Sequence, residues 1–499
     1  MPSSVYNYVV AFGAAFGGLL FGYEIGVVGQ VLVMDSTFGK YFGIAYADPA
    51  NTKDNGWSRT SDYSDVTGNV TMTFLLGCLA GAAIVSWMAD FLGRKRSILI
   101  GGILFVIGVT MQVAAASIGV LYTGRVIGGL GIGILSMAVP LFIAETAPTH
   151  LRGRMVTVQQ LMITIGILVA SIINAIIIKT SDETNLRWRL ALGMQLVPGV
   201  GVVVCNVFMP YSPRWLANRD RDSEAIKILA RLRGVSIEDA SVQAEFREIK
   251  ESIEMERQIG TGSWAELLKP GIRNRVVFAV MLQLFQQWTG INFILYYLPK
   301  LIVDMGFTHD QADIPFSIAN NFINMVGTFP GMYLVERSGR RALLLWGAVS
   351  MAFFQLLTCL MIGLKSHGTG FSWVAVFSIF GFTLSFASTW GPIVWVYQSE
   401  IFPLRVRAKG TGIGTMSNWA NNAIIAKVGP KLTDAIDFKV YAMFGGLALA
   451  GGAFSAIWIP ETKGVALEEL DTLFGAEPLV HESNKTIGGA DVELVKEKA

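Results

Sequence analysis

The chain has 499 residues, of which 52% are hydrophobic and only 15% are charged. Since a soluble domain carries roughly 25% charged residues, this composition excludes an ordinary soluble enzyme and favours a protein of the lipid bilayer. The formal net charge of +2 predicts no nucleic acid or other polyanion as a partner. The four histidines are scattered without metal-ligand spacing, so we expect neither a metal nor another cofactor.

Apolar stretches of about 20 residues, the length that crosses hydrocarbon as a helix, follow one another along the chain. Six precede a polar segment at 211–273 and six follow it. This order predicts an all-α membrane protein with one six-helix bundle in 1–210, a second in 274–460 and a tail at 461–499. The predicted spans are 8–34, 69–89, 97–117, 120–144, 155–178, 189–209, 274–303, 312–335, 342–364, 371–399, 410–430 and 439–459.

In the first predicted span a single acid, Glu24, interrupts the run GGLLFGYEIGVVGQ, and in the fourth Arg125 interrupts LYTGRVIGGLGIG. A charge inside hydrocarbon is costly and must face a partner or water, so we expect these opposite charges to pair. A pair that breaks when the acid takes up a proton would couple protonation to conformation. The alternative is a static ion pair that only fixes the register of the helices.

Three motifs occur twice, in the same order and about half the chain apart: ADFLGRKR and VERSGRR, ETAPTHLR and EIFPLRVR, PYSPRWL and PETKG. Such recurrence indicates a duplicated architecture. Because each copy lies among apolar spans, the repeated unit is a block of membrane helices, as in transporters that hold their substrate between two halves. The matched ionisable positions are Asp90 with Glu336, Arg94 with Arg340, Glu145 with Glu400 and Arg152 with Arg407.

These repeated charges predict a latch at the ends of the helices. We expect opposite charges from neighbouring helices to hold the inner face shut, as Asp90 with Arg94 and Glu145 with Arg152 in the first half. Glu336 with Arg340 and Glu400 with Arg407 repeat the arrangement in the second half. The charges could instead serve topology alone, but the positive-inside rule requires no acids.

Polar side chains inside other spans form a second set. Their amides offer both donors and acceptors, which suits hydroxyl groups, and tryptophan adds a flat apolar face with an N–H at its edge. As a set they predict a site for a neutral polyol, although each amide could equally make an interhelical hydrogen bond worth under about 1 kcal/mol. The residues are Gln160, Gln286, Gln287, Asn292, Asn324, Trp395, Asn418 and Trp419.

The polar segment 211–273 mixes charges with apolar residues at helical spacing, as in EFREIKESIEMERQ, which predicts amphipathic helices on the membrane surface. Arginine and lysine gather in the short loops on the same side as this linker, so that side is expected to be cytoplasmic, with both termini in it. The loop at 35–68 then faces outward. No cleavable signal peptide is visible, so the first span is expected to act as its own signal anchor.

The motifs ADFLGRKR, AETAPTHLRGR, SPRWL, QQWTGINFILYY, VERSGRR, SEIFPLRVRAKGTG and PETKGVALEEL together resemble the sugar porter family of the major facilitator superfamily. The resemblance implies two six-helix bundles, alternating access, and a monosaccharide bound mainly by the second bundle. It carries the family's sugar contacts over to Gln160, Gln286, Gln287, Asn292, Asn324, Trp395 and Asn418, with Trp419 adjacent. The Glu24 position is an aspartate in proton-coupled members and an asparagine in animal facilitators, and Arg125 matches the arginine that pairs with that aspartate.

The chain departs from the family pattern at four places. Glu24 is one methylene longer than the usual aspartate, and Tyr211 stands where the motif has a glutamate of the latch. Phe91 replaces an arginine after Asp90. Gln398 replaces a common proline, with an effect that the sequence does not assign.

The leading hypothesis is a monomeric, proton-coupled monosaccharide symporter of the plasma membrane. A facilitator of sugars or of a polyol such as inositol, with Glu24 as a fixed structural partner, is the alternative within the same fold. A sugar receptor that does not transport ranks lower, because only a short tail follows PETKG. An enzyme ranks lowest, since no nucleophile, base or metal constellation is present.

Overall fold

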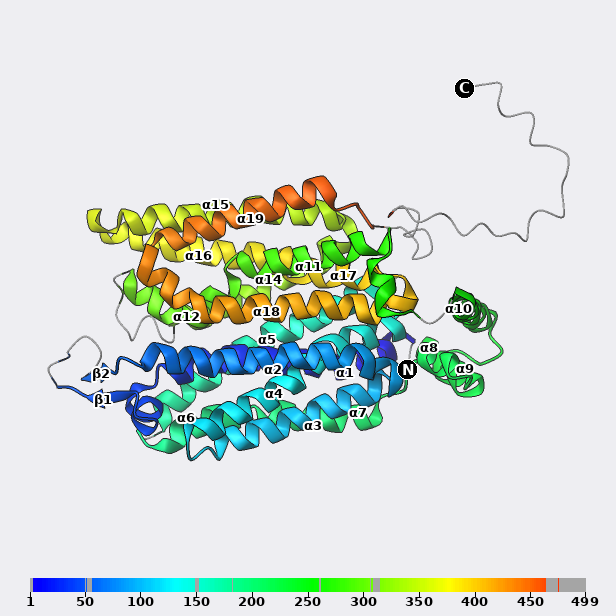
Figure 1. The fold of residues 1–499 in the computed structure, drawn as a ribbon, viewed down its shortest axis with the longest axis horizontal. Helices are drawn as coiled ribbons and strands as arrows, with labels where there is room; N and C mark the ends of the chain where they lie inside the picture. The colour runs from blue at the N-terminus through cyan, green and yellow to red at the C-terminus, as the bar shows by residue number, and fades with distance from the viewer. Residues whose placement is uncertain are drawn as a thin grey trace, which may run out of the picture.

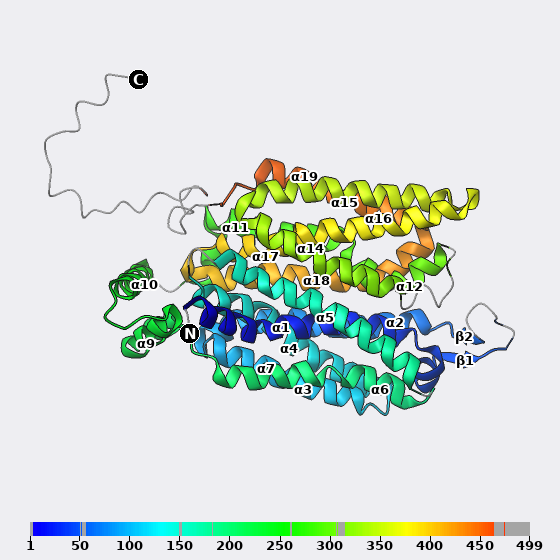
Figure 2. The same ribbon diagram turned by 180° about the vertical axis from the view of Figure 1, so that it is seen from behind.

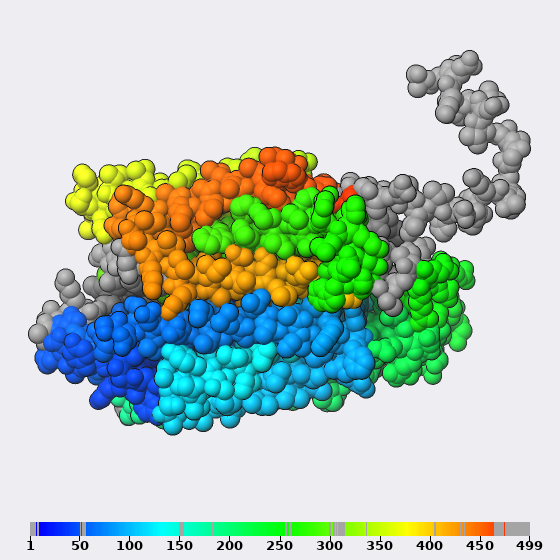
Figure 3. Space-filling view, in the orientation of Figure 1, coloured from blue at the N-terminus to red at the C-terminus, as the bar shows by residue number. Residues whose placement is uncertain are grey.

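The computed structural model describes residues 3–49, 51, 56–148, 152–181, 183–259, 262–305, 307, 315–463 and 474. Figure 1 shows the helices of the first half and those of the second half lying side by side as two bundles with roughly parallel axes. The space-filling view in Figure 3 shows the two halves meeting along one long seam. The protein is thus built from two blocks that face each other, with the seam between them.

The first bundle contains α1 (Ser3–Leu32), α2 (Tyr63–Phe91), α3 (Arg94–Val113), α4 (Ile118–Thr146), α5 (Arg152–Thr180), α6 (Asn185–Gly193) and α7 (Leu196–Phe208). The second contains α11 (Ile272–Trp288), α12 (Ile291–Asp304), α14 (Ser317–Arg337), α15 (Arg340–Gly363), α16 (Thr369–Ser388), α17 (Trp390–Glu400), α18 (Leu404–Ile436) and α19 (Lys439–Trp458). Three predicted spans, 189–209, 274–303 and 371–399, are each two helices in the structure. One of these breaks falls at Gly290, whose φ of +90° lies in the left-handed region that favours glycine.

Nine segments of the described residues are long and apolar enough to cross a membrane. The predicted spans outside this set are α11 with α12, α14 and α18. These helices carry five of the six predicted amide positions and Trp419, so polar side chains that lower their hydropathy include the ones first predicted to form a site. The low hydropathy of these segments therefore has an identifiable cause.

The two ends of the molecule differ. The N-terminus lies at the same end as α8 (Pro213–Asn218), α9 (Asp222–Arg233) and α10 (Ala240–Ile259), as Figures 1 and 2 show. The opposite end carries the π-helix η1 (Asp35–Gly39) and an antiparallel pair of strands, β1 (Ala45–Ala47) and β2 (Trp57–Arg59). Two short 3-10 helices, η3 (Trp264–Leu268) and η5 (Lys365–His367), complete the described elements.

The linker segment is helical, as its spacing predicted, but its apolar faces pack on one another. Trp215, Leu216, Leu229 and Ile249 belong to a hydrophobic cluster whose buried residues lie in α8, α9 and α10. The amphipathic pattern therefore serves packing within the protein, because these helices bury apolar residues against one another.

The duplicated motif forms the same turn in both bundles. Gly93 precedes α3 with φ +86° and ψ 156°, and Gly339 precedes α15 with φ +87° and ψ 160°. Only glycine adopts this conformation without strain, which explains why it stands at the same place in both copies. The two halves repeat in local backbone geometry as well as in sequence.

Glycines allow the backbones of α1 and α5 to touch. A Cβ atom at Gly22 would lie 1.8 Å from the carbonyl oxygen of Ile163, and one at Gly166 would lie 2.2 Å from that of Leu19. Small residues allow such close approach between membrane helices, where association depends on packing. The position of α1 is thus set by backbone contact with α5.

We therefore expect Gly22→Ala to destabilise the protein by about 1–3 kcal/mol, the usual cost of overpacking, and to lower the apparent melting temperature in detergent. Gly446→Ala is the matched control, because nothing lies within 4 Å of its missing Cβ and alanine is the better helix former. Equal melting temperatures for the two variants would contradict this account of the α1–α5 contact.

Candidate functional site

A cavity lies between the two bundles and brings together most of the polar set predicted from the sequence. Its open space, mouth included, is about 510 Å³, within the range of small-molecule sites. Among the described residues, α1 and α5 contribute from the first bundle, while α11, α12, α14, α16, α17 and α18 contribute from the second. The predicted residues that line it are Gln160, Gln286, Gln287, Asn292, Asn324, Trp395 and Asn418.

The break between α11 and α12 sets amides on both sides of Gly290 toward this cavity. Across the break the side-chain amide of Asn292 donates to Gln287 Oε1 at 2.6 Å. Gln286 donates to the carbonyl oxygens of Trp390 and Gly391 at 2.8 and 3.2 Å, where α17 begins. The amides are therefore held by their neighbours before any ligand arrives, which lowers the cost of ordering them on binding.

The two predicted tryptophans play different parts. Trp395 lines the cavity. Trp419 is fully buried and is absent from the cavity lining. It packs against Phe21 with ring centroids 5.0 Å apart, and its Nε1–H donates to Ser136 Oγ in the first bundle at 3.2 Å. Trp419 therefore joins the bundles beside the site, while Trp395 faces the site itself.

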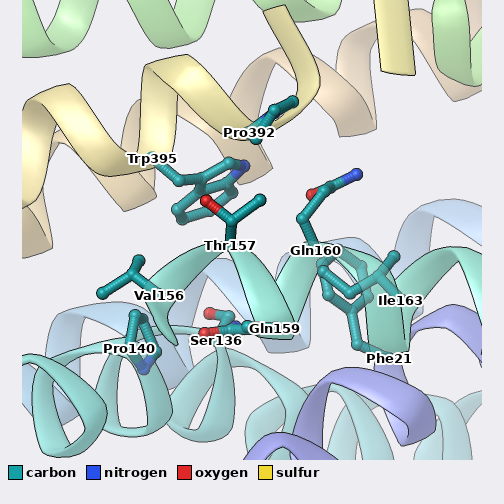
Figure 4. Close-up of a pocket in the computed structure, with 10 residues that line it drawn as sticks. All are labelled: Phe21, Ser136, Pro140, Val156, Thr157, Gln159, Gln160, Ile163, Pro392 and Trp395. Atoms are coloured by element: carbon teal, nitrogen blue, oxygen red, sulfur yellow. The ribbon is translucent and has the colours of Figure 1, made fainter. Parts of the chain in front are cut away.

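A second cavity of about 360 Å³, mouth included, adjoins the first toward the end that carries the N-terminus and α8 to α10. Phe21, Gln160 and Trp395 line both spaces. Figure 4 shows Trp395 and Pro392 of α17 facing Thr157 and Gln160 of α5 across this space. The two cavities form a path along the seam, and Trp395 and Gln160 stand where they meet.

The predicted intramembrane pair is present. Arg125 Nη1 of α4 donates to Glu24 Oε1 of α1, and each side chain is only 2% exposed. Arg125 Nε also donates to the carbonyl oxygen of Val70 at 3.0 Å, and its guanidinium lies 4.4 Å above the ring of Phe74. Among the described residues, Glu24 Oε2 is buried without a hydrogen-bond partner. Three contacts hold the cation, whereas one carboxylate oxygen is left available.

The pair and the cavity lie on different faces of one helix. Phe21 and Ile25 of α1 line the cavity, while Glu24 between them pairs with α4. The carboxylate therefore lies on the side of α1 that faces α4, and not on the side that lines the cavity. A change in the Glu24–Arg125 contact would bear directly on the position of α1.

At the end of the first bundle that carries α8 to α10, the predicted pair of Asp90 with Arg94 is present, and Glu145 also pairs with Arg94. Arg94 contacts Glu145 at 2.8 Å and Asp90 at 3.3 Å, and Glu145 also accepts from Ser212 Oγ at 2.5 Å. Arg94 of the motif ADFLGRKR thus forms a crossed pairing with Glu145 of the motif ETAPTHLR, and both motifs lie in the first bundle. The side chain of Arg152, the expected partner of Glu145, lies outside the described residues.

The second bundle repeats this crossed pairing. Arg340 contacts Glu400 through Nη2 at 2.8 Å and through Nε at 3.3 Å. Arg407, the expected partner of Glu400, donates from Nε to the carbonyl oxygen of Phe402 at 3.2 Å. The side chain of Glu336 lies outside the described residues. The ion pairs of Arg94 with Glu145 and of Arg340 with Glu400 therefore each join helices of a single bundle.

The two halves differ where the third motif meets the glycine turn. Glu461 accepts from the backbone N–H groups of Arg340 and Arg341 at 2.8 and 3.0 Å, capping α15. In the first bundle, Tyr211 occupies the corresponding motif position, and the ammonium of Lys95 lies 5.1 Å from its ring. A neutral ring over a cation replaces a carboxylate on a helix N-terminus, so the first turn is held without that acid.

Contacts between bundles also close the end that carries β1 and β2. Lys427 of α18 lies 3.0 Å from Asp65 Oδ1 and 3.0 Å from Asn69 Oδ1 of α2. Deeper in, a Cβ atom at Gly29 of α1 would lie 2.9 Å from the carbonyl oxygen of Tyr296 in α12. The cavity is thus covered on this side by helices of both bundles.

Sequence reasoning missed the residues behind the cavity amides. Gln283, Gln398 and Thr415 are buried and hydrogen-bonded to one another or to Asn418. Gln283 precedes Gln286 by one helical turn, a spacing that places both on one face and could have indicated it. Gln398 was visible only as a departure from a motif.

A family model described as sugar (and other) transporter matches residues 10–474. The sugar transport protein MST7 of Oryza sativa subsp. japonica is 33% identical over 480 residues, which cover 95% of this chain and 92% of that protein. The high-affinity hexose transporter HXT6 of Saccharomyces cerevisiae is 33% identical over 494 residues, covering 95% of this chain and 83% of that protein.

Among solved structures, the proton:xylose symporter XylE bound to 6-bromo-6-deoxy-D-glucose is similar with a TM-score of 0.81 and 29% identity, over 95% of this chain and 100% of that one. The inward-open conformation of the xylose transporter XylE from E. coli gives 0.71 and 28% identity, over 94% and 100%. The arrangement of the bundles in this chain is thus more similar to the ligand-bound structure than to this inward-open one.

We expect Glu400→Gln to weaken the tie between α15 and α17, because it removes the charge from a mostly buried pair with Arg340. The loss should be about 1–3 kcal/mol, seen as a lower apparent melting temperature in detergent. Asp90→Asn is the control: its side chain is 47% exposed, and such surface pairs contribute about 0–1 kcal/mol. A Glu400→Gln protein as stable as Asp90→Asn would show that the crossed pairing carries no stability.

Proposed function

Because the chain belongs to the sugar porter family of the major facilitator superfamily, and is therefore a monosaccharide transmembrane transporter, we propose that it couples sugar entry to proton entry. The all-α membrane fold and the transporter class predicted from the motifs are confirmed by these matches, as is the prediction that the chain is not an enzyme. We further propose a monomer of the plasma membrane with both termini in the cytoplasm, supported by the gathering of arginine and lysine at one end.

We propose that the cavity binds a hexose. Amides from five helices surround it, and Trp395 offers an apolar face for the C–H side of a pyranose ring. The lining has no ionised side chain among the residues described, which suits a neutral ligand. A polyol such as inositol is the alternative ligand, since the same amides serve any ring of hydroxyls.

The observation that carries proton coupling is the buried Glu24–Arg125 pair on the helix that also lines the cavity. A proton has an available position, because Glu24 Oε2 has no partner among the described residues. Protonation would remove the charge that faces Arg125, while Val70 and Phe74 keep the guanidinium in place. α1 would then be free to move relative to α4, and with it Phe21 and Ile25 against the sugar.

We propose that the cytoplasmic charges keep the inner ends of each bundle rigid while the bundles rock. Arg94 with Glu145, and Arg340 with Glu400, join helices inside a bundle. A described hydrogen bond between the bundles, from Trp419 to Ser136, involves uncharged groups. Rocking can therefore separate the bundles along the second cavity without breaking these ion pairs.

A facilitator is the second candidate function. Arg125 is buried and has three contacts, with Val70, Glu24 and Phe74. A purely structural cation would be held in the same way. In that case Glu24 only balances a buried charge, and sugar moves down its own gradient. The two readings differ in what happens when the carboxylate is made permanently neutral.

Glu24→Gln should abolish accumulation of labelled hexose in proteoliposomes that carry an inward proton gradient, because a neutral amide cannot exchange a proton. Exchange of labelled for unlabelled sugar at equal concentrations should persist, since it needs no net proton movement. Accumulation above equilibrium by Glu24→Gln would refute the coupling role. Failure of both accumulation and exchange, together with a lower melting temperature of the variant, would indicate that the ion pair is structural.

Gln287→Ala should raise the KM for hexose by about 5- to 150-fold, because a buried hydrogen bond to the ligand is worth about 1–3 kcal/mol when its partner is left unsatisfied. Asn421→Ala is the control: this amide lies in α18 but does not line the cavity. Similar KM values for the two variants would remove Gln287 from the site, and competition by inositol would test the alternative ligand.

A further inference from the structure

Behind the cavity, five buried side chains of α11, α17 and α18 form one continuous chain of hydrogen bonds. Asn418 donates through Nδ2 to Gln283 Oε1 at 2.6 Å and to Gln286 Oε1 at 2.9 Å. Gln283 Nε2 donates to Gln398 Oε1 at 2.9 Å, and Gln398 Nε2 donates to Thr415 Oγ1 at 3.1 Å. We call this set the amide relay; its members are Gln283, Gln286, Gln398, Thr415 and Asn418.

Both ends of the amide relay meet backbone carbonyl groups, which can only accept. Gln286 Nε2 donates to the carbonyl oxygens of Trp390 and Gly391, and the hydroxyl of Thr415 donates to the carbonyl oxygen of Thr411 at 2.9 Å. An amide can usually be placed either way round, but here the carbonyls decide. The carbonyls at the two ends thus fix the direction of every bond in the relay, and donation runs outward from Asn418 to both ends.

The consequence falls on Asn418, which lines the cavity. Both hydrogens of its amide nitrogen are already used by Gln283 and Gln286. Only its Oδ1 is left for a ligand, and a carbonyl oxygen accepts. The amide relay therefore makes Asn418 an acceptor, which selects a ligand with a hydroxyl donor at that point.

We propose that Gln398 is a positioning residue that sets this polarity without touching the sugar. It accepts from Gln283 on the cavity side and donates to Thr415 on the other side. Gly414 makes room for it, since a Cβ atom there would lie 2.4 Å from Gln398 Oε1. An apolar side chain at 398 leaves Gln283 Nε2 without its acceptor, so Gln283 turns and one N–H of Asn418 becomes available to the ligand.

This inference rests on the proposed sugar contact of Asn418 and is tested by ligand binding rather than by transport. The probes are hexoses in which one hydroxyl at a time is replaced by hydrogen or by fluorine. Fluorine accepts weakly and cannot donate, so it reports whether a site offers a donor or an acceptor. Affinities are measured on purified protein for the unaltered chain, Gln398→Met and Thr415→Val, with Gln112→Met as control for a buried glutamine outside the amide relay.

In the unaltered chain, one ring position should lose at least about tenfold in affinity on either replacement, with the fluoro sugar binding no better than the deoxy sugar. Asn418→Ala should remove the loss at that position, which identifies it. In Gln398→Met and Thr415→Val, the fluoro sugar should bind several-fold more tightly than the deoxy sugar there, and the double variant should add nothing further. Gln112→Met should keep the original order.

If the fluoro-to-deoxy ratio at that position is unchanged in both relay variants that retain hexose binding, the positioning role of Gln398 is wrong. If Gln398→Met does not fold, Thr415→Val still decides, because it removes the acceptor at the far end. No hexose binding by the unaltered chain, whose melting curve shows it folded, would instead contradict the proposed function. The two failures are therefore distinguishable.

Discussion

The ion pair between Glu24 and Arg125 is the constraint on which the first bundle depends. Two opposite charges lie in a membrane interior where neither could stand alone, so α1 must remain against α4 while both are ionised. α1 in turn touches α5 through Gly22 at backbone distance and presents Phe21 and Ile25 to the cavity. The same helix thus connects a titratable group to the ligand space, which gives a proton a mechanical route to the sugar.

The second bundle contains buried amides in place of a buried ion pair of this kind. Its α11, α14 and α18 carry amides that lower their hydropathy, and four of these amides line the cavity: Gln286, Gln287, Asn324 and Asn418. Buried amides are tolerated when they are satisfied. The amide relay shows how this is done, because each member is held by a neighbour and the ends rest on backbone carbonyls. One bundle therefore supplies the coupling charge and the other supplies most of the recognition.

Much of this could be predicted from the sequence. Intramembrane charges and amides are rare enough in apolar spans to stand out, so Glu24, Arg125 and the polar residues of the cavity could be singled out from the sequence, whereas its apolar lining could not. The crossed pairing of Arg94 with Glu145 could not be predicted, because spacing along the chain does not tell which helix ends meet. The role of Gln398 was hidden for the same reason: its partners are 115 and 17 residues away along the chain. Trp419 was placed beside the site but not seen as a link between bundles.

The most direct test of proton coupling is to follow the pH inside proteoliposomes when hexose is added outside, with no proton gradient imposed and the membrane voltage clamped by potassium and valinomycin. Symport predicts acidification of the lumen that depends on hexose, is absent in protein-free vesicles, and saturates at the same sugar concentration as uptake. Hexose that enters while the internal pH stays constant would contradict the account and make Glu24 and Arg125 a structural pair in a facilitator.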